Sequence, residues 1–134
     1  MRISIIVASM AALLSCATTA SQAQTQTVSR AAASGVPLNL TFTGWINPDC
    51  TSGGQTTVRL VERPQHGQTR IRAARDFPTF RPGNARIVCN THRVPGIAAY
   101  YVSQRGYFGP DSTTIEIIYP NGRLIHRTYV ISVR

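Results

Sequence analysis

The feature that most restricts the fold is a series of short alternating apolar and polar runs, separated by turn residues, across residues 36–134. No stretch in this region has the apolar period of about 3.6 residues that marks an amphipathic helix, whereas Gly, Pro and Asn recur between the runs. Seven runs are predicted as strands: 38–42, 56–61, 68–73, 86–89, 98–103, 113–119 and 124–133. Short strands with frequent turns predict one all-β domain, a β-sandwich or small barrel.

The last two runs predict a β-hairpin with a definite register. Side chains alternate with a period of two along a strand, so the apolar residues of 113–119 and 124–133 face one core only if the loop has three residues. That loop is a structural turn in which the last residue is left-handed: Pro120, Asn121 and Gly122. The same register places Glu116 opposite His126 on the outer face.

The first 23 residues are predicted to be a secretory signal peptide. Arg2 precedes an apolar run over 3–14, which is followed by small residues, and cleavage after Ala20 or Ala23 fits this plan. The run is too short to span a bilayer, which takes roughly 20 apolar residues, so we expect no transmembrane helix. The alternative is a lipoprotein signal that ends before Cys16, because residues 13–16 resemble a lipobox and would place a lipid on that cysteine.

Residues 24–35 are polar or small and show no periodicity. They are predicted to be a flexible linker before the domain at 36–134.

Two cysteines remain after the signal, Cys50 and Cys89. An even pair in an exported chain predicts a disulfide, and the close spacing with His partners typical of metal or redox pairs is absent. We therefore expect the protein in the periplasm, attached to the outer membrane, or outside the cell.

The charge is strongly basic. All 14 basic residues are Arg, and removing Arg2 with the signal leaves thirteen against five acids, a net charge of +8. This field favours anionic partners, either glycans or lipid headgroups of the envelope, although solubility alone also accounts for net charge. The candidate anion-binding residues are Arg63, Arg70, Arg72 and Arg75. No aromatic stacking series accompanies them, which argues against nucleic acid.

The order of several motifs resembles the Ig-like and cadherin-like domains of bacterial secreted and surface proteins, here in a single copy. The motifs are Pro64-Gln65-His66-Gly67, the pair Tyr100-Tyr101, the stretch 108–112 (FGPDS), the turn 120–122 and the terminal strand 129–133 (YVISV). The resemblance implies an Ig-like β-sandwich used for adhesion or binding, with Pro64, His66 and Gly67 in a structural turn. The clustered acids of calcium-binding arrays are absent, so no metal is expected.

No constellation predicts catalysis or a cofactor. The three histidines lie far apart in sequence, no nucleophile motif is present, and both mature cysteines are expected to be bonded. The chain is therefore predicted to be a non-enzymatic envelope module that binds anionic components or a partner protein. Two alternatives stay open. One is an inhibitor of a hydrolase that presents the loop Cys89–Gly96, and the other is an accessory subunit that uses the exposed edge of the terminal strand.

Overall fold

The computed structural model describes residues 24–134, so the predicted signal peptide and Cys16 lie outside the described residues. The all-β prediction is confirmed: the described chain has nine strands and one short 3-10 helix, η1, and no α-helix. The elements are β1 (Gln24–Ala32), β2 (Leu38–Thr43), β3 (Trp45–Ile46), β4 (Ser52–Gly54), β5 (Thr57–Glu62), β6 (Gly67–Asp76), η1 (Ile87–Thr91), β7 (Val94–Ser103), β8 (Gly109–Ile118) and β9 (Leu124–Val133).

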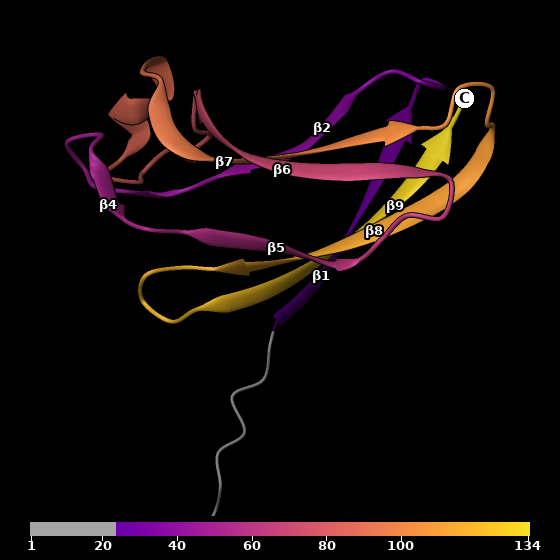
Figure 1. Cartoon of the computed structure of the whole chain (residues 1–134). Helices are drawn as coiled ribbons and strands as arrows, with labels where there is room; N and C mark the ends of the chain where they lie inside the picture. Colours follow the sequence, from indigo (N-terminus) through magenta and orange to yellow (C-terminus); the bar gives the residue numbers. More distant parts are fainter. Residues whose placement is uncertain (1–23) are drawn as a thin grey trace, which may run out of the picture.

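Two larger sheets form two layers, as Figure 1 shows. One sheet has the strand order β1-β9-β8-β5 and the other has the order β2-β7-β6. The short strands β3 and β4 pair with each other at one end of the molecule.

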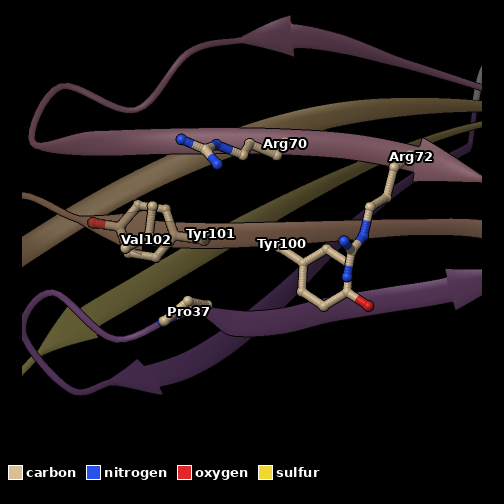
Figure 2. Close-up of a pocket in the computed structure, with 6 residues that line it drawn as sticks. All are labelled: Pro37, Arg70, Arg72, Tyr100, Tyr101 and Val102. Atoms are coloured by element: carbon tan, nitrogen blue, oxygen red, sulfur yellow. The ribbon is translucent and has the colours of Figure 1, made fainter.

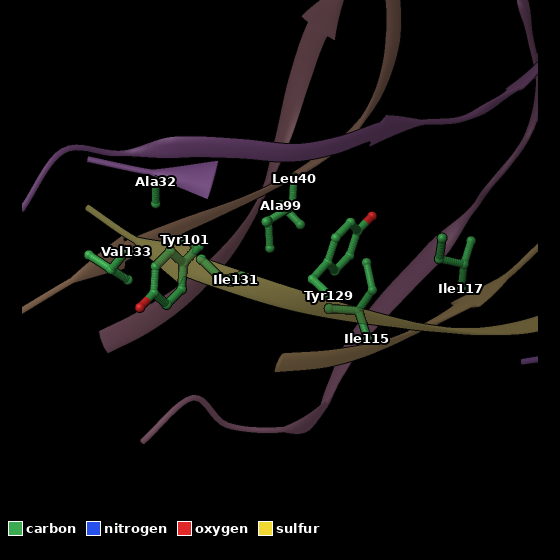
Figure 3. Close-up of a cluster of buried hydrophobic side chains, with 9 residues drawn as sticks. All are labelled: Ala32, Leu40, Ala99, Tyr101, Ile115, Ile117, Tyr129, Ile131 and Val133. Atoms are coloured by element: carbon green, nitrogen blue, oxygen red, sulfur yellow. The ribbon is translucent and has the colours of Figure 1, made fainter. Parts of the chain in front are cut away.

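The main core lies between these sheets because strands from both layers send alternate side chains inward. Along β8, Ile115 and Ile117 are fully buried, and along β9 Tyr129 and Ile131 are buried on the same side. Figure 3 shows the side chains that meet there: Ala32, Leu40, Ala99, Tyr101, Ile115, Ile117, Tyr129, Ile131 and Val133. Nonpolar area removed from water in this way contributes about 25 cal/mol per Å².

The β8–β9 hairpin has the predicted register. Ile118 pairs with Leu124, and the N–H of Tyr119 donates to the carbonyl of Arg123 at 2.9 Å, which leaves residues 120–122 as the loop. Gly122 has φ +81°, the left-handed conformation that the prediction required. Glu116 Oε2 and His126 Nε2 lie 3.0 Å apart across the two strands.

The prediction of a flexible linker over 24–35 is wrong for most of that segment. Residues 24–32 form β1, which runs parallel to β9 from the pair Gln24 and Ile125 to the pair Ala32 and Val133. Val28 packs against the main core and Ala32 is part of it, so burial holds this polar segment in the sheet. β9 therefore lies between β1 and β8, and the terminal strand has no exposed edge in the described chain.

The predicted strand at 86–89 is also wrong. Residues 87–91 form η1, in which Cys89 is buried while Ile87 and Val88 are exposed, so burial does not alternate as in a strand. The predicted disulfide is confirmed, with a Cα–Cα distance of 5.3 Å between Cys50 and Cys89. Around it is a small second core, formed by Ile46, Cys89 and Val94 together with Phe42, Cys50 and Phe80.

Candidate anion-binding site

Arg70 and Arg72 project from the same face of β6, away from the main core. Their neighbours Thr69 and Ile71 pair with Tyr101 and Ala99 on β7, which are both fully buried in the core. Because successive side chains of a strand point to opposite faces, the two arginines face outward. Both are exposed.

Tyr100 lies beside these arginines on the neighbouring strand. It pairs with Arg70, and the guanidinium carbon of Arg72 lies 4.7 Å from the centre of its ring. Such a cation–π contact restricts the position of the guanidinium group. Its nitrogens make no hydrogen bond to any of residues 24–134, so they are available to a ligand. These side chains line a hollow of about 220 Å³, which Figure 2 shows. Its lining residues are Pro37, Arg70, Arg72, Tyr100, Tyr101 and Val102.

The positive charge of this hollow is not neutralised by nearby acids. No Asp or Glu lines it. Within residues 24–134 the one ion pair closer than 4.0 Å joins Glu116 to His126, so none of the arginines described here pairs with a carboxylate. Among residues 24–134 the one side-chain hydrogen bond of Arg70 is to a neutral amide, with Nη2 3.4 Å from Gln68 Oε1. The face therefore presents two guanidinium groups to solvent.

The other predicted anion-binding residues lie elsewhere. Arg63 is exposed in the loop between β5 and β6. Arg75 is an odd number of residues from Arg70 and Arg72 on β6, so its side chain lies on the other face of the strand. Its Nη2 donates to the carbonyl of Arg93 at 2.9 Å. Neither lines the hollow.

No family model matches this chain, and the comparison with curated proteins found no significant match. The likeness to cadherin-like domains stays a prediction. What the structure establishes is an all-β domain of several packed sheets with a disulfide.

Three of the motifs behind that likeness meet at one buried carboxylate. Asp111, in the FGPDS stretch, is 8% exposed and accepts hydrogen bonds from the Tyr101 hydroxyl at 2.8 Å and from the N–H groups of Gln65 and His66 at 3.0 and 3.1 Å. Burial, together with this carboxylate, raises the pKa of Tyr101 above its ordinary value. These donors belong to β7 and to the turn after β5. The buried carboxylate therefore holds that turn in place.

Gly67 ends this turn at a point where the backbones approach closely. A Cβ on Gly67 would lie 2.5 Å from the carbonyl oxygen of Val102 and 2.8 Å from the ring of Tyr101. The His66 ring stacks on Tyr107, with ring centres 4.0 Å apart. The Pro64–Gly67 motif is thus explained by packing between β6 and β7.

The histidines do not gather into a metal or catalytic site. His66 stacks on Tyr107, His92 Nδ1 lies 3.1 Å from the carbonyl oxygen of Val88, and His126 contacts Glu116. Across residues 24–134 no three His, Cys, Asp or Glu side chains come together as metal ligands would. In the same range no helix has the length and apolar character needed to cross a bilayer.

Tyr100 is the residue of this site that sequence reasoning missed. In the sequence it stands out only as part of the Tyr100-Tyr101 motif, whereas its position across from Arg70 follows from the pairing of β6 with β7. An aromatic residue in a neighbouring predicted strand was the available signal. The pairing register was needed to use it.

Proposed function

We propose that this chain is an exported, non-catalytic binding module of the cell envelope, which binds anionic groups of envelope glycans or lipid headgroups through the face formed by Arg70, Arg72 and Tyr100. The observation that carries the proposal is the pair of exposed guanidinium groups beside an aromatic ring, with no carboxylate lining the hollow. Guanidinium groups bind phosphate and carboxylate through two parallel hydrogen bonds.

The whole-molecule charge supports the same partner class. After loss of the signal the net charge is +8, from thirteen arginines and five acids. Because the arginines described here are not paired with carboxylates, their field is available to attract anions from a distance. The local face then provides the directed contacts.

The strand order supports an Ig-like sandwich within the all-β class. In the constant-type Ig fold, strands B, E and D share one sheet and strands C, F and G share the other. The orders β2-β7-β6 and β5-β8-β9 correspond to these sets, with β2 as B and β9 as G. β1 departs from this plan, because it joins β9 and not the sheet of β2. Such sandwiches commonly serve as binding domains, although fold alone does not fix function.

The disulfide indicates an oxidising compartment outside the cytoplasm. The predicted signal peptide places the module in the envelope or beyond it. Attachment to the outer membrane requires the lipoprotein alternative at Cys16.

The test is binding of the purified mature protein to matched anionic and neutral probes. The probes are vesicles with and without phosphatidylglycerol, and polygalacturonate beside dextran. We expect binding to an anionic probe only, weakening steeply between about 0.05 and 0.5 M salt because exposed charges are screened. The vesicle and polysaccharide arms distinguish a lipid from a glycan as the source of the anion.

The decisive comparison uses two double variants with the same net charge. R70Q/R72Q removes the two guanidinium groups of the face, and we expect an affinity loss of about tenfold or more. R59Q/R134Q removes two exposed arginines outside the hollow and is expected to change affinity by less than about threefold. Equal losses in both variants would show that diffuse charge, and not this face, is responsible. Absence of binding to every anionic probe would overturn the proposal.

A further inference from the structure

A second hollow, of about 300 Å³, lies where three separate segments meet. The junction of β2 and β3 contributes Trp45, the loop before η1 contributes Phe80, Asn84 and Arg86, and the β8–β9 turn contributes Tyr119 and Arg123. Its volume is at the lower end of the range of about 300–1,000 Å³ typical of small-molecule sites. None of these residues lines the hollow beside Arg70 and Arg72.

The aromatic side of this second hollow is held in place. The rings of Trp45 and Tyr119 have centres 5.8 Å apart and planes tilted by 53°. The Tyr119 hydroxyl lies 2.9 Å from Thr43 Oγ1, and a Cβ on Gly53 would lie 2.6 Å from Trp45 Cδ1, so the indole packs directly on that glycine. A fixed aromatic surface of this kind can receive the flat, apolar face of a ring.

Arg86 supplies a positioned positive charge. Its Nε donates to the carbonyl oxygen of Ile46, and its backbone N–H donates to Asn84 Oδ1 at 2.9 Å. The disulfide at Cys89, three residues further along the chain, anchors the same segment. Within the described chain the terminal nitrogens of Arg86 have no protein partner, so the edge that binds anions in the bidentate manner is free.

Arg123 adds a second positive charge from the β8–β9 turn, a segment distant from Arg86 in the sequence. It is exposed in the turn after β8, and its one side-chain hydrogen bond among residues 24–134 joins Nη2 to Gln24 Oε1 at 3.3 Å. No acid lines the hollow. The site therefore combines an aromatic surface with two guanidinium groups and one amide.

From this combination we infer a binding site for an acidic sugar residue, such as a uronic acid. The pyranose ring lies against Trp45 and Tyr119, and its carboxylate is held between Arg86 and Arg123. Asn84 offers an amide to the ring hydroxyls. A neutral sugar leaves the two guanidinium groups without an anion, so the site discriminates in favour of the acid. The inference is independent of the function proposed above, because the two hollows share no residue.

Binding at this hollow can be followed by tryptophan fluorescence, since Trp45 is the only tryptophan in the sequence. Trp45 fluorescence is recorded while the purified protein is titrated with tetragalacturonate, with maltotetraose as the neutral probe and sodium chloride at equal ionic strength as the salt control. We expect a saturable change with tetragalacturonate alone. R123Q, a change at an exposed turn residue, is expected to weaken this binding by about tenfold.

Two further variants separate the sites. R86K keeps the charge but loses the planar fork, and is expected to weaken binding by a similar factor if its melting curve shows a folded protein. R70Q/R72Q is expected to leave the fluorescence titration within about twofold of the unmodified protein, even where it abolishes binding at the other face. An equal response to maltotetraose, no response to either sugar, or unchanged affinity in R123Q would each overturn the inference.

Discussion

Asp111 is the residue on which distant parts of the chain converge. Its carboxylate accepts hydrogen bonds from Tyr101 on β7 and from the backbone of Gln65 and His66 in the loop before β6. A buried carboxylate is costly unless its acceptor positions are filled, and hydrogen bonds to a charged group are stronger than those between neutral groups. Any change that removes one donor therefore leaves part of this cost uncompensated.

Replacing Tyr101 by Phe removes one donor from Asp111 with little change of shape. We expect the free energy of unfolding to fall by about 1.5–3 kcal/mol, measured by urea denaturation at neutral pH. Tyr129→Phe is the matched control, since the Tyr129 hydroxyl is buried and has no hydrogen-bond partner within the described chain. The control is expected to be neutral or slightly stabilising. A larger loss in the control than in Tyr101→Phe would contradict the assignment.

The raised pKa of Tyr101 also predicts a loss of stability in alkali. The stabilising contribution is complete below the ordinary tyrosine pKa of about 10, where the residue is protonated in both states. Above that pH the unfolded chain releases the proton while the folded protein retains it, so the free energy of unfolding falls as the pH rises. We expect Tyr101→Phe to reduce this fall between about pH 10 and 12. An identical alkaline slope in the two proteins would refute it.

Among the strands, the sequence predicted those whose apolar and polar residues alternate. It did not predict the segments whose conformation depends on a partner distant in the sequence. β8 and β9 alternate apolar and polar residues, so their register followed from parity alone. β1 reads QTQTVSRAA, in which only Val28 and Ala32 pack against the core or belong to it, and its strand conformation depends on β9 beside it. Residues 86–89 contain apolar residues in strand-like order, yet the disulfide and the bond from Arg86 to Ile46 hold the segment in another shape.

The disulfide joins η1 to the loop between β3 and β4, and it links two residues that are 39 positions apart in the sequence. In the chain-entropy model a loop of about this length contributes roughly 4 kcal/mol by restricting the unfolded chain. We expect Cys50→Ala with Cys89→Ala to lower the free energy of unfolding by about that amount in urea titrations. Dithiothreitol should have a comparable effect on the unmodified protein and none on the double variant. Unchanged stability after verified reduction would contradict this prediction.

For the whole molecule, charge was readable from the sequence but its arrangement was not. The net charge and the shared face of Arg70 and Arg72 follow from composition and alternation. The position of Tyr100 beside them depends on which strand neighbours β6. The second hollow joins Trp45, Arg86 and Arg123, which are too far apart in sequence for any local pattern to connect them.

Removing residues 24–32 tests the role of β1 in the whole domain. The deletion uncovers the edge of β9 and takes Val28 and Ala32 from the core, so we expect lower stability and concentration-dependent association through the free edge. Light scattering and thermal melts of a chain that begins at residue 33 and of one that begins at residue 24 measure both effects. A flexible linker would be dispensable, so a monomeric shortened chain with unchanged melting temperature would disprove the structural role of β1.

The parallel pairing of β1 with β9 has a consequence for the order of assembly. Residues 24–32 meet their partner only when residues 125–133 are present, so a chain that is still being synthesised cannot complete this sheet. The cystine between Cys50 and Cys89 needs no part of β9 and is able to form earlier. The pairing of β1 with β9 is therefore expected to be a late step in folding, after the disulfide is able to form.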